Sequence, residues 1–139
     1  MNWPTIIMAA PNGARKVKKD HPELPVSIAE TIATAKACYA EGASILHAHV
    51  RGYEDEHILD TARYQALISG LRMHVPDMLV QITTEAAGIY SPQQQSDLVF
   101  ALKPDFVSVA LKEMLYDDSA MAYQKAKYFY HKAQAEGIH

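Results

Sequence analysis

The sequence has 139 residues, of which 49% are hydrophobic and 21% are charged, a balance typical of one globular domain with its own core. The net charge of −3 at pH 7 gives no indication of a nucleic-acid or membrane surface. No apolar run approaches the ~20 residues that a membrane span needs, and the first residues lack the pattern of a signal peptide. The single cysteine excludes an internal disulfide and a site of several thiolates. We therefore expect a cytoplasmic protein.

Short apolar runs alternate with helical patterns along the chain. Strands are predicted at residues 5–11, 44–50, 78–85 and 106–111, and helices at residues 27–42, 60–76, 91–104 and 117–137. Strands that alternate with helices are typical of a parallel sheet whose strands are joined by helical crossovers. The order therefore predicts (βα)4, an α/β fold with four parallel strands.

Capping residues mark the starts of the predicted helices. Ser27 with Glu30 three residues later forms a capping box, and Asp60 is the cap of the second helix. Ser91 caps the third helix, with Pro92 at the first helical position. Two architectures fit this pattern: a small, open, doubly wound sheet, or half of a (β/α)8 barrel.

Two histidines lie one residue apart in the second predicted strand, in the segment SILHAHVRG. Because side chains alternate along a strand, His47 and His49 share one face. Two neutral imidazoles on one face are suited to bind zinc or a similar divalent ion. The alternative is a pair of core histidines bonded to backbone or hydroxyl groups. The remaining histidines are expected in solvent, in loops or on helix surfaces: His21, His57, His74, His131 and His139.

Other polar residues also follow the predicted strands, at the edge where parallel α/β proteins bind ligands. Asn12 and Gly13 form a turn after the first strand, and this pair is common in turns without any ligand. Thr83 and Ser108 are candidate substrate-binding residues, although threonine is also an ordinary strand residue. Glu85 stands out because a carboxylate at a buried strand end needs a partner or a function.

Four segments together resemble the β-keto acid cleavage enzymes, a family typified by 3-keto-5-aminohexanoate cleavage enzyme. They are APNGARKVKKDHPELPVSIAE, GASILHAHVRG, VQITTEAAGIYSPQQQ and LKPDFVSVAL, and they occur in the order and spacing of the family. The resemblance implies a (β/α)8 barrel. Residues 1–139 would then be a single amino-terminal half-barrel domain, truncated before the second half.

The same resemblance implies a chemistry. Family members bind zinc through the histidines that match His47 and His49, and through a glutamate on a late strand beyond His139. They cleave a β-keto acid with acetyl-CoA as co-substrate, giving acetoacetate and a new acyl-CoA. Zinc would act as a Lewis acid for the β-keto oxygen. The late arginine and aspartate that resemblance assigns to catalysis also lie beyond the chain, so no catalytic residue is assigned within it.

Several substrate-binding positions carry over by resemblance, and two depart from it. Thr83 and Ser108 match hydroxyl residues that bind the substrate carboxylate, while Asn12 and Gly13 lie at the strand-one edge of the site. Arg15 stands where the typical enzyme has glutamate, so that carboxylate's role does not transfer. Glu85, a fifth candidate substrate-binding residue, stands where the typical enzyme has glycine. A different substrate choice is therefore expected.

Two further interpretations compete with an enzyme. The chain could be a non-catalytic half-barrel scaffold or oligomerisation module, because open strand edges and an exposed inner sheet face favour association into a homo-oligomer. On this interpretation the isolated chain is inactive. A nucleotide-binding module is disfavoured, because neither a G-x-G-x-x-G loop nor a Walker loop occurs in the sequence.

Overall fold

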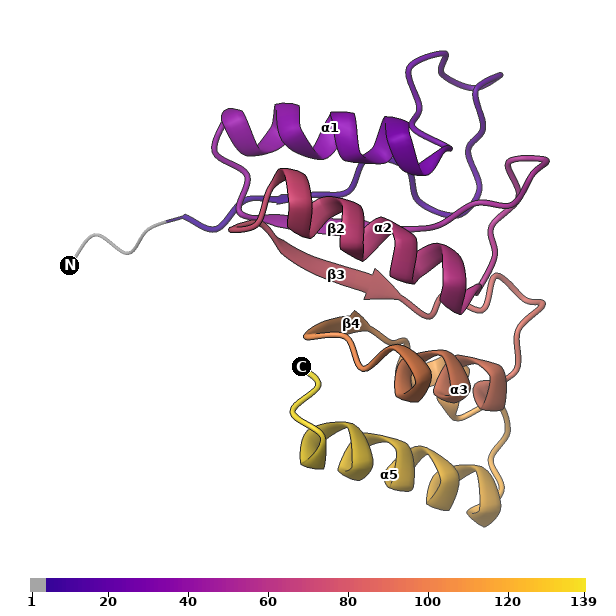
Figure 1. Ribbon diagram of the computed structural model, residues 1–139. Coiled ribbons are helices and arrows are strands. Elements are labelled where there is room, and N and C mark those ends of the chain that lie inside the picture. The colour runs from indigo at the N-terminus through magenta and orange to yellow at the C-terminus, as the bar shows by residue number, and fades with distance from the viewer. Residues whose placement is uncertain (1–4) are drawn as a thin grey trace.

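The computed structural model describes residues 5–139, which form one parallel sheet with helices packed against it (Figure 1). Within these residues the strands are β1 (Met8–Ala9), β2 (Ile45–Ala48), β3 (Leu79–Thr83) and β4 (Phe106–Ser108). They lie in the order β1-β2-β3-β4, and every neighbouring pair is parallel. The helices of the same residues are α1 (Ile28–Ala40), α2 (Thr61–His74), α3 (Pro92–Leu102), α4 (Leu111–Met114) and α5 (Ala120–Ala135).

The sequential strand order decides between the two predicted architectures. Crossovers between parallel strands are nearly always right-handed, so strands added in one direction carry their helices on the same face. A doubly wound sheet instead reverses direction and has helices on both faces. The observed order is that of half a (β/α)8 barrel, and the predicted fold class is confirmed.

The strands are shorter than predicted. The first predicted strand, residues 5–11, is reduced to the two residues of β1, which lies at an edge and pairs only with β2. The last predicted strand, residues 106–111, ends at Ser108, and the short α4 begins at Leu111. The Glu113 side chain of α4 accepts a hydrogen bond from the Ala86 N–H at 3.0 Å. This contact holds α4, a helix that the sequence did not predict, against the loop after β3.

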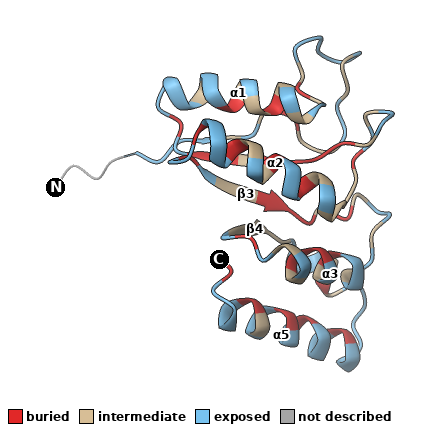
Figure 2. Ribbon diagram, in the orientation of Figure 1, coloured by how far each residue is buried: buried red, intermediate tan, exposed pale blue. Residues whose placement is uncertain are grey.

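Alternation within β2 separates a core face from an inner face. Leu46, Ala48 and Val50 pack into the main hydrophobic core with α1 and α2. His47 and His49 therefore lie on the opposite face, which would be the inside of a barrel. A second core cluster joins α3, α4 and α5 around Val99, Met114 and Phe129. Figure 2 shows that the helices turn their buried residues inward and their exposed residues toward solvent.

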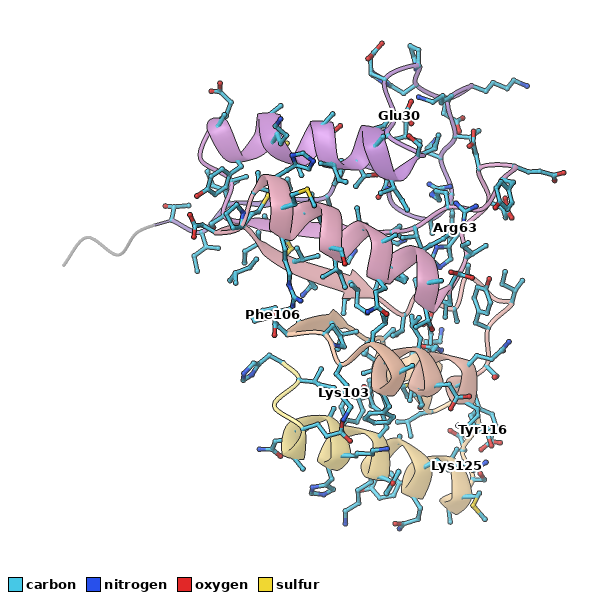
Figure 3. All side chains as sticks on the ribbon, viewed as in Figure 1. Glu30, Arg63, Lys103, Phe106, Tyr116 and Lys125 are labelled. Atoms are coloured by element: carbon cyan, nitrogen blue, oxygen red, sulfur yellow. The ribbon has the colours of Figure 1, made fainter. Side chains whose placement is uncertain are left out.

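The predicted capping box forms at α1, and the structure adds a second one at α3, where the sequence predicted Ser91 as the cap. Ser27 accepts from the Glu30 N–H, and the Glu30 carboxylate accepts from the Ser27 N–H at 2.9 Å. Figure 3 shows Glu30 at the start of α1, where it also pairs with Lys18 at 2.7 Å. At α3 the same box uses Ser91 and the neutral Gln94. In the described residues no helix is both long enough and apolar enough to cross a membrane.

Tyr64 of α2 links the helix layer to the ends of two strands. Its side chain is fully buried, and its hydroxyl donates to the Thr83 carbonyl oxygen at 3.1 Å. The Ala48 carbonyl oxygen lies 3.5 Å from the same hydroxyl. Burial raises the pKa of Tyr64 above its ordinary value, so the hydroxyl keeps its proton and remains a donor.

The Glu30 cap should make a pH-dependent contribution to stability. The hydrogen bond with Lys18, then the one with the Ser27 N–H, lowers the pKa of Glu30 from 4.5 to about 2. A lowered pKa means that the stabilisation is present above pH 4.5 and is lost as the pH falls toward 2. Because 42% of the side chain is exposed, we expect Glu30→Gln to cost about 0.3–1 kcal/mol at pH 7.

Urea unfolding at pH 7 and pH 3 measures this contribution. The difference between the parent and Glu30→Gln should shrink at pH 3. Gln94→Ala, which changes the uncharged box of α3, is the control and should cost the same at both pH values. A Glu30→Gln difference that does not change with pH contradicts the assignment.

The Tyr64 hydroxyl should contribute about 1 kcal/mol to folding, because Tyr64→Phe leaves a buried carbonyl oxygen without its donor. Thermal unfolding of Tyr64→Phe measures the loss. Tyr53→Phe is the matched control, since Tyr53 is 97% exposed and its hydroxyl is in solvent. Equal unfolding temperatures for the two variants would show that the Tyr64 hydroxyl does not stabilise the strand ends.

Candidate active site

Four of the predicted site residues form one row across the carboxyl ends of the strands. Thr83 of β3 pairs directly with Ser108 of β4. The register of β2 and β3, continued by one residue past Ala48, places His49 beside Thr83. Asn12, which follows β1, donates from Nδ2 to the His49 carbonyl oxygen at 2.9 Å, and the His49 N–H lies 3.4 Å from its Oδ1. The parallel register thus brings together residues from four separate segments.

The two histidines of the His-x-His segment converge through their Nε2 atoms. His47 Nε2 and His49 Nε2 are 3.2 Å apart, and the ring planes are inclined by 70°. His47 Nδ1 lies 2.7 Å from Gln81 Oε1, and Gln81 is its register partner on β3. Because an amide oxygen only accepts, His47 carries its proton on Nδ1 and leaves the lone pair on Nε2.

This geometry fits a shared metal ion. Zinc–nitrogen bonds of ~2.0–2.1 Å at a tetrahedral angle separate two ligand nitrogens by about 3.3–3.4 Å. The measured Nε2–Nε2 distance of 3.2 Å is close to that separation. The Gln81 contact is the kind of second hydrogen bond that orients metal-binding histidines. Among residues 5–139, however, no group of three or more histidine, cysteine or acidic side chains is arranged to hold a metal.

Burial keeps His49 uncharged. Its side chain is 4% exposed, and this burial, followed by the charges of His47, His57 and Arg51, lowers its pKa to about 3. A neutral imidazole retains the lone pair that a metal ligand needs. His49 Nδ1 is buried without a hydrogen-bond partner in the described structure.

The side chain of Arg51 holds the loop that follows β1. This guanidinium is 2% exposed and donates from Nη2 to the carbonyl oxygens of Asn12 and Lys16, at 3.2 and 2.8 Å. Between them, Gly13 has φ +62°, a left-handed conformation that glycine adopts without strain. The Asn12 amide is itself fully used, because Nδ2 also donates to the Pro25 carbonyl oxygen at 3.2 Å.

The hydroxyl residues of this row and the charged residues beside it differ in exposure. Thr83 is 4% exposed, and its hydroxyl accepts a hydrogen bond from the Glu85 N–H at 3.1 Å. Ser108 is half-buried on the neighbouring strand. Glu85 is not deeply buried: its side chain is 33% exposed and lies 4.0 Å from the Arg15 guanidinium, which is 84% exposed. The partner that a carboxylate at this strand end needs is therefore Arg15, at the open rim of the site.

The expectation that His57 is in solvent is wrong. His57 is 6% exposed, and its ring lies 5.2 Å from that of His49, between centroids. The loop after β2 folds back on itself, with a bridge between Arg51 and His57 and a hydrogen bond from the Gly52 N–H to the Glu56 carbonyl oxygen. Nothing in the local sequence, which is rich in acidic residues, marks this return. The other four histidines are exposed, as predicted.

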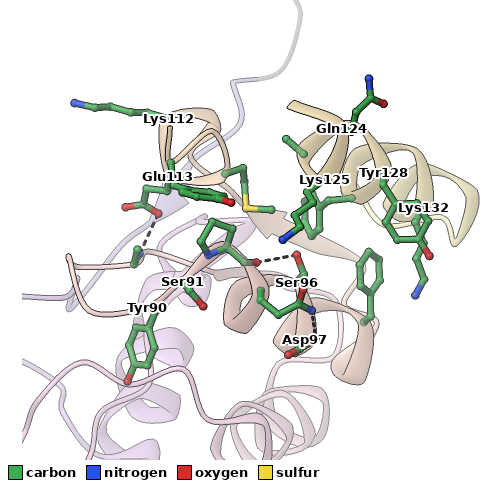
Figure 4. Close-up of a pocket in the computed structure, with 18 of the residues that line it drawn as sticks. Tyr90, Ser91, Ser96, Asp97, Lys112, Glu113, Gln124, Lys125, Tyr128 and Lys132 are labelled. Atoms are coloured by element: carbon green, nitrogen blue, oxygen red, sulfur yellow. Dashed lines mark hydrogen bonds between the residues drawn. The ribbon is translucent and has the colours of Figure 1, made fainter. Parts of the chain in front are cut away.

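A separate groove lies away from this row. A groove of about 1090 Å³ separates α3 from α5, with Ser96 and Asp97 on one wall and Lys125 and Lys132 on the other (Figure 4). Neither histidine of the converging pair lines it. The row of strand-end residues, and not this groove, carries the groups suited to catalysis.

Comparison with known proteins gives a consistent result. The sequence model of the beta-keto acid cleavage enzyme family matches residues 4–139. A 3-oxoadipate:acetyl-CoA acetyltransferase of Cupriavidus necator is 28% identical over 110 residues, which are 79% of this chain and 38% of that protein. A 3-keto-5-aminohexanoate cleavage enzyme of Acetoanaerobium sticklandii is 31% identical over 104 residues, or 75% of this chain and 38% of that enzyme.

A 3-keto-5-aminohexanoate cleavage enzyme of Fusobacterium nucleatum is 35% identical over 82 residues, which are 59% of this chain and 30% of that enzyme. The chain spans about half the length of the curated relatives it matches. Because the family match extends over nearly every residue, the chain belongs to the β-keto acid cleavage enzyme family.

Proposed function

We propose that the protein containing this chain is a zinc-dependent β-keto acid cleavage enzyme. It would use acetyl-CoA as co-substrate and release acetoacetate and a new acyl-CoA. The observation that carries the proposal is the convergence of His47 and His49, whose Nε2 atoms are 3.2 Å apart at the carboxyl edge of a barrel-like sheet. The relatives named for acetyl-CoA transfer and keto-acid cleavage support the reaction class. Because acetyl-CoA is an intracellular metabolite, the proposal includes a cytoplasmic location.

Two protein ligands are too few for a catalytic zinc site, which normally has three. On this proposal residues 1–139 form the amino-terminal half of a barrel, and the third ligand comes from outside the described residues. When bound, zinc would supply Lewis-acid stabilisation of negative charge on the β-keto oxygen, worth several kcal/mol. The chain's contribution is to present two neutral imidazoles, one of them oriented by Gln81.

The hydroxyls of Thr83 and Ser108 would bind the substrate carboxylate. They lie on paired residues of neighbouring strands, beside His49, so a carboxylate held there places the β-keto group toward the histidines. Asn12 and Gly13 would shape the wall of the site, because the Asn12 amide is already bonded to the protein. Glu85, with Arg15, would contact the far end of the substrate at the rim and select it by charge.

A second proposal concerns assembly. The inner face of the sheet exposes apolar residues at its amino end, where Met8 is 43% exposed and Leu79 49%. The β1 and β4 edges also lack a neighbouring strand within the described residues. We propose that this half-barrel unit, taken alone, associates through these surfaces into a homo-oligomer without catalysing the reaction. Sedimentation of residues 1–139 showing a stable monomer would contradict the proposal.

Removing either histidine should remove the metal. Elemental analysis of the purified protein should find zinc in the parent and little in His47→Ala or His49→Ala, because each variant loses one of the two imidazole ligands that the chain supplies. His74→Ala is the control, since His74 is exposed at the end of α2 and should leave zinc unchanged. Undiminished zinc in both site variants would reject these residues as ligands.

Ser108→Ala should weaken use of the β-keto acid without removing the metal. Loss of one hydrogen bond to a charged carboxylate, about 1.5–3 kcal/mol, lowers kcat/KM roughly 10- to 150-fold, while zinc content stays at the parent level. Steady-state assays with a panel of β-keto acids measure the effect. Ser69→Ala, on the exposed side of α2, should behave like the parent. An unchanged kcat/KM for Ser108→Ala would exclude its hydroxyl from substrate binding.

A further inference from the structure

Two ring nitrogens beside the histidine pair are buried without a hydrogen-bond partner in the described structure: His49 Nδ1 and His57 Nδ1. Both residues are almost fully buried, with 4% and 6% of their surface exposed. Buried polar atoms without partners are uncommon in folded proteins, and each one calls for an explanation. Here the two lie on neighbouring rings.

The proton of the His57 ring can be placed from its surroundings. His57 Nε2 lies 2.8 Å from the Glu85 carbonyl oxygen, which can only accept. In the neutral ring Nε2 therefore carries the proton, and Nδ1 is left with a lone pair. His57 Nδ1 is therefore a buried hydrogen-bond acceptor on the ring next to His49.

Which ring nitrogen of His49 carries the proton depends on whether a metal is bound. Without metal, the lone pair of His47 Nε2 is satisfied by a proton on His49 Nε2, 3.2 Å away, so His49 Nδ1 has a lone pair and faces another acceptor. If Nε2 instead binds the metal, the proton must lie on Nδ1, which then becomes a donor. The acceptor on His57 fits only this second, metal-competent tautomer.

The ring separation suits such a bond. The centroids of the two imidazoles are 5.2 Å apart and their planes are inclined by 61°. Ring nitrogens lie about 1.1 Å from the centroid, so two rings joined by an N–H···N bond of about 2.9 Å have centroids up to about 5.1 Å apart. The observed separation of 5.2 Å is close to that of directly bonded rings.

We propose that His57 is a positioning residue for the metal site: its Nδ1 accepts the Nδ1–H of His49 and so stabilises the tautomer of His49 that binds metal. The inference rests on the proposed zinc site. It gives a role to a histidine that the sequence placed in solvent, and it accounts for both unpartnered nitrogens. Outer hydrogen bonds of this kind typically change metal affinity by about 10- to 100-fold.

Zinc affinity, measured by competition with a chelating dye in the protein that contains this chain, tests the inference without using activity. His57→Gln keeps an amide donor for the Glu85 carbonyl oxygen but loses the Nδ1 acceptor, so zinc should bind about 10- to 100-fold more weakly. His57→Asn places an amide oxygen near the former Nδ1 and should recover most of the affinity. His74→Gln, at the exposed end of α2, should bind zinc like the parent.

A second measurement uses the parent protein alone, so it does not depend on a variant folding. Nitrogen-15 NMR of histidine-labelled protein should find the His49 proton on Nε2 before zinc is added and on Nδ1 afterwards, with a coupling across the hydrogen bond to His57 Nδ1. A zinc-loaded protein without that coupling, or a folded His57→Gln that binds zinc as tightly as the parent, overturns the inference and leaves the zinc site intact. A parent protein that binds no zinc overturns both proposals.

Discussion

The candidate site depends on the two-residue period of a parallel strand held in register by its neighbours. In β2 this period sends Leu46 and Ala48 into the helix-covered core and His47 and His49 to the inner face. A shift of one residue would bury the imidazoles in the core and expose the aliphatic side chains, which makes the register costly to change. Tyr64 reinforces the same register by bonding to the carbonyl oxygen of Thr83 at the end of β3. The packing of the core therefore fixes the geometry of the site.

Local signals made most of the fold predictable from the sequence. Ser27, Asp60 and Ser91 each cap the helix that the sequence assigned to them, because capping is decided by a few neighbouring residues. Strand lengths were less predictable: β1 has only two residues, although the apolar run extends from residue 5 to 11. Strand pairing depends on a partner distant in the sequence, and an edge strand has one partner instead of two.

The site was predictable where its residues lie in strands or directly after them. The convergence of His47 and His49 follows from spacing alone, whereas the burial of His57 follows from how a loop returns over the strand end. That return involves Arg51, whose guanidinium donates to three main-chain oxygens of two loops: those of Asn12 and Lys16, and that of Asp55 at 2.7 Å. Contacts between a side chain and distant main-chain atoms leave no periodic pattern in a sequence. The residues that support a site are for this reason harder to predict than those that line it.

The inner part of the site and its rim differ in charge. Arg51 is buried, forms no ion pair with a carboxylate among the described residues, and lies beside a neutral His49. Burial lowers the pKa of Arg51, but a guanidinium starts so high that it keeps its charge. Arg51 therefore adds a buried positive charge to the inner part of the site, which under the proposed function would suit a substrate that carries a carboxylate and develops further negative charge as it reacts. At the rim, the positive charge of Arg15 and the negative charge of Glu85 lie 4.0 Å apart, between Nη2 and Oε1. Under the proposed function, Arg15 and Glu85 at the rim would distinguish among β-keto acids, while the inner residues would perform the chemistry common to the family.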